Sequence, residues 1–520
     1  MSKTIVRLFS AAAILVSVAA CDGDSTPPPS TEWQQGVFQD EATFASKCVA
    51  PRAGIDPATN RPYTDIAGTV LDENNFLRSY SNNTYLWYDE IVDQDPGNFD
   101  DPLDYFGELR TFATINTGAR KDKFHFTYDS MEWYNLSQGG VSAGYGAEWA
   151  VISPTVPREI VVAYTEPNSP ATAASIARGA VVLEIDGVDI NTNTQAGVDA
   201  LNAGLFPSAL GETHDFTIRD LDGTVRAITM TSQQITNAMV QNTQVINTPT
   251  GKIGYMVFNF HRAPAEAALV DAINALKAGN GIDDLVLDIR YNGGGYLDIA
   301  SQLAYMIAGP GPTAGKTFEE IQFNDKHPIT DPVTGQPLAP TPFYNQTLGF
   351  SLAQGAPLPR LDLPRVFVLT GPGTCSASEA VINGLRGAGV QVIQVGSTTC
   401  GKPYGFYATD NCGTTYFTIQ FRGVNEADFG DYSDGFVPSA VDDTQASVLG
   451  CAVPDDYTKQ LGDPAENRLE VALAYQAGQG CISPAATAPG LLAKPASSLE
   501  SADGLIYRSP FDSNRIMRRP

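Results

Sequence analysis

The chain has 520 residues, of which 43% are hydrophobic, and its 32 lysines and arginines face 58 aspartates and glutamates, a formal net charge of −26. The apolar fraction is ample for packed cores and excludes a globally disordered chain, and the length suggests two to four domains. The acidity excludes nucleic acid as an expected partner and also excludes a general affinity for anionic lipid.

The start of the chain has the pattern of an export signal. A short basic segment precedes residues 8–20, which are apolar or small but too few to span a bilayer. The sequence Val18-Ala-Ala-Cys21 resembles a bacterial lipobox, and the alternative is an ordinary signal peptide with a structural cysteine. We expect a signal peptide over 1–20, a lipid-anchored linker over 21–35, and a mature protein in the cell envelope or periplasm that touches the membrane only through lipidated Cys21.

Six cysteines remain after Cys21, an even number that suggests disulfides in an exported protein. We predict Cys400–Cys412 across a hairpin loop and Cys451–Cys481 near the C-terminus, which leaves Cys48–Cys375. No C-x-x-C sequence occurs and the four histidines are scattered, so no metal site is expected. No cofactor is expected either.

Residues 36–135 are predicted to form an N-terminal helical region. Between residues 75 and 91, aromatic and apolar side chains recur near helical spacing, and residues 103–114 resemble another short helix. We interpret the aromatic stripe as part of the hydrophobic core. The alternative is that it forms a platform for a ligand.

Residues 137–235 contain short strands, a helix near 196–203 and a hairpin around Asp222-Gly223. The pieces Ser169-Pro-Ala and Ile185-Asp-Gly187 make this segment resemble a PDZ domain. The resemblance implies that Gly144, Tyr145 and Gly146 form a loop whose N–H groups capture the C-terminal carboxylate of a peptide that adds as a strand. The alternative is a small β-domain that serves only as a spacer.

Residues 245–480 alternate between buried strands and helices, which is typical of an α/β core with largely parallel strands. A strand over 251–260 precedes a helix over 263–279, and a strand over 284–290 precedes the turn Tyr291-Asn-Gly-Gly-Gly295 and a helix over 297–307. Three glycines in a row let backbone N–H groups approach a ligand closely. Residues 311–359 are predicted to be a loop insertion near the cleft, and residues 481–520 a flexible tail.

Ser376 is predicted to lie where a buried strand turns sharply into a helix. The apolar run at 365–370 is followed by Gly371-Pro-Gly-Thr-Cys375, and helical spacing begins at Ala377. Unpaired N–H groups and the helix dipole at this point would stabilise a developing oxyanion. The alternative is that Ser376-Ala-Ser-Glu379 is only a capping box.

Lys402 follows a second buried run, over 390–395, and is flanked by Gly401 and Pro403. This position suits a solvated surface charge poorly. If the side chain is desolvated, the amine is expected to be neutral near pH 7 and able to take the proton of a serine.

Three pieces in this order, Leu287-Asp-Ile-Arg-Tyr-Asn-Gly-Gly-Gly295, Ser376-Ala-Ser-Glu379 and Gly401-Lys402, resemble the S41 family of serine proteases, the C-terminal processing peptidases. The resemblance implies Ser376 as nucleophile, Lys402 as general base and an oxyanion hole from the Ala377 N–H with Gly293 or Gly294. It also implies a multidomain α/β fold: a crotonase/ClpP-like catalytic core, a preceding PDZ-like β domain and the N-terminal helical region.

One position departs from the family. Many members carry a glutamine four positions after the lysine, and this chain has Phe406. The orienting partner of the lysine therefore stays open between Glu379 and the hydroxyls of Thr398 and Thr399, and Ser378 is the alternative nucleophile. We predict a serine endopeptidase whose partners are proteins or peptides with free C-termini. The alternative is a lipid-anchored peptide-binding scaffold with a degenerate protease fold.

Overall fold

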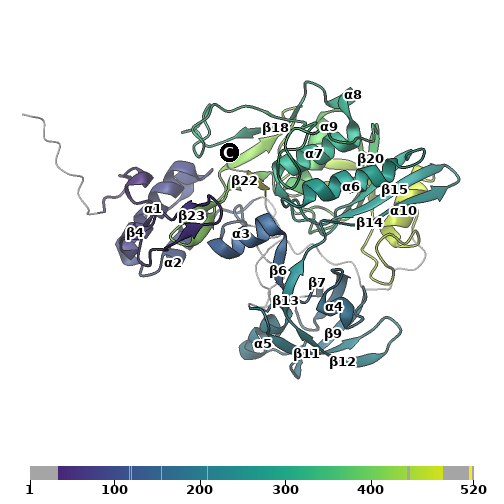
Figure 1. The fold of residues 1–520 in the computed structure, drawn as a ribbon, viewed down its shortest axis with the longest axis horizontal. Helices are drawn as coiled ribbons and strands as arrows, with labels where there is room; N and C mark the ends of the chain where they lie inside the picture. The colour runs from purple at the N-terminus through teal and green to yellow at the C-terminus, as the bar shows by residue number, and fades with distance from the viewer. Residues whose placement is uncertain are drawn as a thin grey trace, which may run out of the picture.

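The computed structural model describes residues 33–115, 118, 120–153, 155–207, 209–441, 446–483 and 515–517. The predicted signal peptide and Cys21 lie outside the described residues. Within the described part of the chain, no helix combines the length and the apolar character needed to cross a bilayer. Figure 1 shows an N-terminal region, a β-domain and a larger core that carries most of the helices.

The core is built on one seven-stranded sheet, in the order β14-β15-β16-β20-β21-β27-β26. Every neighbouring pair from β15 to β26 is parallel, and β14 pairs antiparallel with β15 at one edge. The predicted α/β core with largely parallel strands is therefore present. The strands are β14 (Val240–Thr248), β15 (Gly251–Phe258), β16 (Asp284–Asp288), β20 (Arg365–Thr370), β21 (Gln391–Gly396), β26 (Val437–Ser439) and β27 (Ser447–Ala452).

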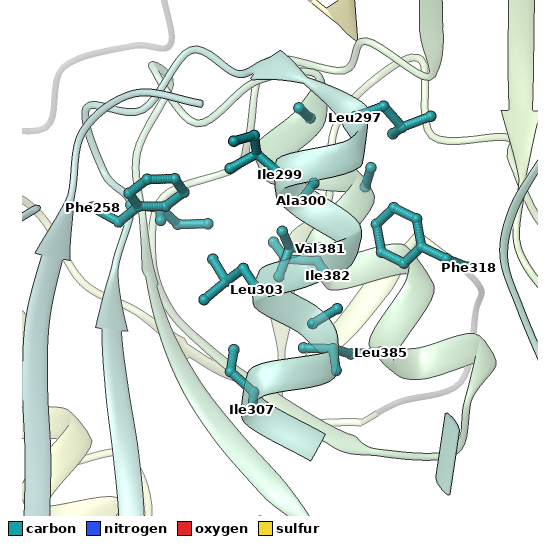
Figure 2. Packing of buried hydrophobic residues seen from close by; sticks show 14 of the residues in the cluster. Phe258, Leu297, Ile299, Ala300, Leu303, Ile307, Phe318, Val381, Ile382 and Leu385 are labelled. Carbon is teal, nitrogen blue, oxygen red and sulfur yellow. The ribbon is translucent and has the colours of Figure 1, made fainter. Parts of the chain in front are cut away.

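Helices cover both faces of this sheet, because its strands are apolar on both sides. Helices α6 (Ala265–Lys277), α7 (Leu297–Ala308) and α9 (Ala377–Gly387) share one hydrophobic cluster with the sheet, while α10 (Asn467–Gln476) belongs to a cluster on the opposite face. Figure 2 shows Leu303 of α7 close to Val381 and Ile382 of α9, with Phe258 of β15 beside them. Buried contact with α7 thus fixes α9, and with it the turn that carries Ser376.

The β-domain has its own hydrophobic cluster and a sheet in the order β12-β11-β9-β8-β7, in which β7 is an edge strand. This confirms short strands and a helix in this segment. The elements are α3 (Ser130–Gly139), β6 (Val141–Gly144), β7 (Ala147–Ser153), β8 (Glu159–Thr165), α4 (Pro170–Ala173), β9 (Val181–Ile185), β10 (Val188–Asp189), α5 (Gln195–Leu205), β11 (Thr213–Arg219), β12 (Val225–Thr231) and β13 (Gln233–Thr236).

The N-terminal region is helical only in part. Its helices α1 (Val70–Thr84) and α2 (Pro102–Glu108) pack together with Tyr416. Strand β5 (Phe126–Asp129) adds to the hairpin of β23 (Thr409–Asn411) and β24 (Thr414–Phe417), so this region is anchored to the C-terminal half of the chain. Short strands that the sequence did not predict complete it: β1 (Lys47–Cys48), β2 (Ile55–Asp56), β3 (Arg61–Pro62) and β4 (Ile66–Ala67).

Two of the three predicted disulfides are wrong. The structure pairs Cys48 with Cys412 and Cys375 with Cys400, while Cys451–Cys481 is as predicted. The error arises because β24 lies beside β5 of the N-terminal region, which brings Cys48 to the β23–β24 turn. Cys375 therefore pairs with Cys400, which lies two residues before Lys402.

A second sheet lies at the edge of the core, in the order β17-β28-β22-β25-β18-β19. It corrects two predictions. The proposed loop insertion over 311–359 contains β18 and β19, and residues 515–517 of the tail predicted to be flexible form β28. Its strands are β17 (Gly295–Tyr296), β18 (Thr317–Gln322), β19 (Thr341–Pro342), β22 (Tyr404–Tyr407), β25 (Phe421–Val424) and β28 (Arg515–Met517); α8 (Pro310–Thr313) precedes β18.

Candidate active site

The site residues come from turns that follow four neighbouring parallel strands. Strand β15 leads to His261, β16 to the glycine turn after Asn292, β20 to Ser376 and β21 to Lys402. Because the carboxyl ends of parallel strands meet at one edge of a sheet, residues far apart in sequence converge there. The edge is where ligands bind in open α/β folds.

Ser376 has a backbone conformation that an ordinary helix cap does not have. Its φ is 58° and its ψ is −113°, whereas a capping serine normally takes extended angles. A non-glycine residue with positive φ is strained and persists where the surrounding structure imposes it, often at a functional site. The residue is fully buried between β20 and α9. Both halves of the capping box are nevertheless present at this turn, and in one of them the Ser376 N–H donates to Glu379 Oε2 at 2.8 Å.

Glu379 joins the serine turn to the lysine loop. Its Oε2 accepts from the N–H of Ser376 and from the N–H of Lys402, each at 2.8 Å, so the two backbone nitrogens lie no more than twice that distance apart. Its Oε1 accepts from the Gly401 N–H at 2.9 Å and from Thr399 Oγ1 at 2.5 Å. The hydroxyl that reaches Glu379 is thus that of Thr399, and the choice of Thr398 as an orienting residue is not supported.

The pKa of Glu379 lies above its usual value because the carboxyl is buried. Thr399 and the N–H groups of Lys402, Gly401 and Ser376 oppose that shift. A carboxyl with this many donors holds the serine turn and the lysine loop in place.

A disulfide ties the same two segments together. Cys375 and Cys400 are bonded, with their Cα atoms 5.2 Å apart, and they precede Ser376 and Lys402 by one and two positions. The Cys400 N–H also donates to the Thr374 carbonyl at 3.0 Å. The covalent bond and the Glu379 hydrogen bonds together fix the spacing of the serine and lysine backbones.

Lys402 is buried between aromatic rings. Its side chain has no exposed surface, and Nζ lies 4.4 Å from the ring centre of Phe124 and 4.7 Å from that of Phe406. Phe406 occupies the position where family members often carry glutamine, and here it contacts the amine with its ring face. Such contacts are worth about 0.5–2 kcal/mol to a cation.

The glycine turn is held against the serine turn by Asn292. Its carbonyl accepts from the Cys375 N–H at 3.1 Å and from Ser378 Oγ at 3.0 Å. Ser378, the alternative nucleophile, therefore has its hydroxyl committed to the backbone. The Asn292 side chain accepts from the Gly294 N–H at 3.0 Å, which removes Gly294 from the candidate oxyanion donors.

Two candidate donors remain at this edge. In the described part of the chain, neither the Gly293 N–H nor the Ala377 N–H donates to a protein acceptor. Gly293 follows the anchored Asn292, and Ala377 is the first residue of α9, where the helix leaves N–H groups unpaired. Both N–H groups lie in turns that meet beside Ser376 and are candidates to donate to a bound oxygen.

His261 is a residue that the sequence gave no reason to select. Its N–H donates to the Gly294 carbonyl at 3.0 Å, and Nδ1 lies 3.1 Å from Asn292 Oδ1. An amide oxygen only accepts, so Nδ1 carries the proton. Burial lowers the pKa of His261 to about 3, which keeps the ring neutral. The ring therefore supports Asn292 and the glycine turn.

The comparisons with known proteins agree with this arrangement. Residues 252–405 match the model of peptidase family S41, and residues 72–128 match the peptidase S41 N-terminal domain. This part of the chain is therefore similar to the core of S41 peptidases. It is 24% identical over 408 residues to carboxyl-terminal-processing peptidase 2, chloroplastic, of Arabidopsis thaliana, covering 77% of this chain and 67% of that protein.

A solved structure shows the same fold. The protein, from Bacteroides fragilis NCTC 9343 and assigned to the S41 proteases, aligns with a TM-score of 0.55 at 21% identity over 80% of this chain and 98% of that one. The fold is thus multidomain α/β, with an S41 core and an S41 N-terminal domain.

The S41 N-terminal domain contributes side chains to the S41 core. Phe124, within the matched residues 72–128, supplies one ring beside Lys402, and the adjacent Lys123 donates from Nζ to the Cys400 carbonyl at 3.1 Å. Burial lowers the pKa of Lys123, while Glu379 and Asp434 oppose that shift. No local periodicity marks these two residues, because their contact depends on β5 pairing with β24.

The loop of Gly144, Tyr145 and Gly146 lies in the β-domain and not beside Ser376. The Tyr145 ring is buried against Phe216, and the loop leads directly into edge strand β7. The Tyr145 and Gly146 carbonyls accept backbone N–H bonds within the β-domain, at 2.9 and 2.7 Å. The structure therefore keeps the two predicted sites in separate parts of the molecule (Figure 1).

One group of residue types that can bind metal lies at the core site: Cys375, Glu379 and Cys400. The two cysteines form a disulfide, so they present no thiolate. In this oxidised form the two cysteines form a structural disulfide, and the group does not fit a metal site.

Loss of the Cys375–Cys400 bond is expected to impair activity without unfolding the protein. The double variant Cys375→Ala/Cys400→Ala should lower kcat by about 10- to 100-fold, since small misplacements of reacting groups are costly. The matched control is Cys451→Ala/Cys481→Ala, because the two bonds close loops of similar length, 25 and 30 residues, and each removal should cost about 3 kcal/mol. Equal kcat values for the two variants, measured well below their melting temperatures, would contradict the prediction.

Proposed function

We propose that this protein is a serine endopeptidase that cleaves unfolded proteins or peptides with Ser376 as nucleophile and Lys402 as general base. The observation that carries the proposal is one carboxylate oxygen, Glu379 Oε2, which accepts from the backbone N–H of both residues. It is supported by the strained conformation of Ser376 and by the complete burial of Lys402. Burial strips water from the amine and favours its neutral form, which can accept a proton, and the contacts of the amine with the rings of Phe124 and Phe406 oppose this effect.

The proposed reaction begins with proton transfer from Ser376 Oγ to Lys402 Nζ. Oγ then bonds to the carbonyl carbon of the scissile peptide, and the resulting oxyanion accepts from the N–H groups of Gly293 and Ala377. Each such donor is worth about 3–4 kcal/mol in the transition state. Lys402 gives its proton to the departing amine as the C–N bond breaks. A water that loses its proton to Lys402 then hydrolyses the ester and restores Ser376.

We further propose that the β-domain acts as a PDZ-like module. Strand β7 is an edge strand directly after the loop of Gly144, Tyr145 and Gly146, so a substrate tail can add to it as a further strand. The substrates would be proteins with free C-termini. Localisation in the cell envelope follows from the lipobox-like sequence at Cys21, and replacement of Cys21 by serine should release the protein from membranes.

A fluorophosphonate probe tests the proposed chemistry directly. We expect it to label the native protein at Ser376, to leave Ser376→Ala unlabelled, and to react about 100-fold or more slowly with Lys402→Met. Peptide mapping identifies the modified residue. Absence of labelling in a folded, disulfide-bonded sample would favour the second candidate, a peptide-binding scaffold with a degenerate protease fold. The presence of Phe406 in place of the usual glutamine is the observation that supports this candidate. Labelling at another serine would also contradict the proposal.

A further inference from the structure

Residues 515–517 form a strand, β28, between two strands that follow the glycine turn and Lys402. Strand β28 pairs in parallel with β17 on one side, Gly295 opposite Arg515, and with β22 on the other side, Phe406 opposite Ile516. Strand β17 begins at the last glycine of the glycine turn, and β22 begins two residues after Lys402. Figure 1 shows β22 on the side of the core that faces the N-terminal region.

Strands β17 and β22 do not pair with each other; β28 alone joins them in this sheet. Adjacent strands lie about 4.8 Å apart, so two strands that share one neighbour are separated by about 10 Å. Without β28, each of them would present an unpaired edge toward the other. The space between them is therefore a slot one strand wide, which is the geometry that binds an extended peptide through its backbone.

The direction of β28 identifies which part of a substrate the slot would take. Both pairings are parallel, and they run away from Gly293 and from Lys402 as the chain proceeds from Arg515 to Met517. A peptide in this orientation has its scissile bond on the N-terminal side of the slot. The slot therefore suits the residues that follow the scissile bond and leave as the C-terminal product.

The end of the chain also differs in charge from the rest of the molecule. The last six residues, Arg-Ile-Met-Arg-Arg-Pro, contain three arginines and no acidic residue, while the whole chain carries a net charge of −26. Attraction between this basic end and the acidic body favours docking over release. Its apolar Ile516 and Met517 resemble a β-strand more than a polar linker.

We propose that the slot between β17 and β22 binds the leaving segment of a substrate and that the chain's own C-terminal residues fill it as a tethered competitor. The proposal deepens the proposed function and rests on it, because the slot can bind a substrate only if the protein is a peptidase. About 30 residues separate Ser483 from Arg515 in the same chain, so β28 competes with a substrate intramolecularly. An intramolecular segment acts at an effective concentration that a free peptide need not reach. A tail of weak intrinsic affinity therefore still occupies the slot much of the time.

Removal of the tail tests the competition. A variant that ends at Asn514 is expected to cleave dye-labelled casein with an apparent KM about three- to ten-fold lower than the full-length protein, and with unchanged kcat. The full-length variant Ile516→Pro should behave in the same way, because proline removes a strand N–H and is not accommodated between two strands. The synthetic peptide Arg-Ile-Met-Arg-Arg-Pro should inhibit the truncated protein competitively, and the peptide of reversed sequence should inhibit it much less.

A second measurement does not depend on catalysis. In the Ser376→Ala background, truncation at Asn514 should increase hydrogen exchange at the amides of β22, while the amides of β20 in the core sheet stay unchanged. Increased exchange without any casein cleavage by any variant would leave the tail site standing and reject the proposed function. Release of a C-terminal peptide by the native protein, and not by Ser376→Ala, would show the tail entering the site as a substrate and would support the slot. Unchanged KM together with unchanged exchange would overturn the proposal.

Discussion

Replacement of Ser376 by alanine is expected to lower kcat on an unfolded protein by about 10⁴- to 10⁶-fold while the protein stays folded. The change removes only Oγ, and the buried turn keeps its backbone and the N–H bond to Glu379. The hydroxyl also belongs to the capping box, so the free energy of unfolding should fall by about 1 kcal/mol, which leaves the protein folded. Initial rates with dye-labelled casein and a thermal melt of the same sample measure the two quantities.

Ser378→Ala is the matched control for this prediction. Ser378 is also buried and lies two positions further along α9, but its Oγ donates to the Asn292 carbonyl. That carbonyl keeps a second donor, the Cys375 N–H, so the loss should cost about 1 kcal/mol of stability and only a few-fold in activity. The reverse pattern, with Ser376→Ala active and Ser378→Ala inactive, would move the nucleophile to Ser378.

Local sequence was sufficient for the parts of the fold that local forces determine. The buried run at 365–370 became β20 with the predicted bounds, and the predicted helices after Ala263 and at Leu297 were correct to within two residues at each end. Strand β20 is an apolar run followed by Gly371 and Pro372, and β21 is a largely apolar run that ends at Gly396, a pattern that marks both the strand and the turn after it. The resemblance to the S41 family then placed the serine, the lysine and the glycine turn together before any coordinates.

Contacts between distant segments could not be predicted in the same way. The Cys48–Cys412 bond spans 364 residues, and Phe124 reaches Lys402 only because β5 joins β24. No periodicity in either segment encodes such a contact. The same holds for β28, whose three residues pair with strands more than a hundred positions away. The prediction that Gly294 donates to an oxyanion is not supported for another reason. The Gly294 N–H donates to the side chain of Asn292, and the glycine pattern gave no sign of this hydrogen bond.

The positions of Ser376 and the glycine turn depend on a buried charge cluster at the end of β16. The Arg290 guanidinium is fully buried and donates to Asp288 at 2.9 Å, to Asp455 at 2.7 Å and to Glu466 at 2.8 and 3.0 Å. Its own carbonyl lies 2.9 Å from the place where a Cβ on Gly371 would sit, so the turn before Ser376 packs directly on it. This cluster therefore supports both the serine turn and the glycine turn where they leave the sheet.

Arg290→Met is therefore expected to destabilise the core by about 3–5 kcal/mol at pH 7, because it leaves buried carboxylates without their cation. Arg365→Met is the control. Its partner Asp284 is buried at the start of β16, but Arg365 itself is about a third exposed, so water screens the pair and the loss should be smaller, about 1 kcal/mol. Urea titrations followed by tryptophan fluorescence give both values, and equal losses for the two variants would contradict the assignment. Arg290→Lys, which keeps a charge but loses the paired hydrogen bonds, should fall between them.

The same cluster gives this prediction a dependence on pH. Burial alone would raise the pKa of Asp455, but Arg468, Arg178 and Arg290 hold that pKa well below its usual value. Burial also acts to raise the pKa of Glu466, but Arg290 outweighs it, so that this pKa too lies below its usual value. Groups with lowered pKa contribute stability that is complete above the pKa of the unfolded chain, about 4, and is lost as the pH falls below it. In Arg290→Met these carboxyls regain protons at higher pH, so the gap in stability between native protein and variant should narrow from pH 7 to pH 5. A gap that stayed constant over that range would show that Arg290 acts through packing and not through its charge.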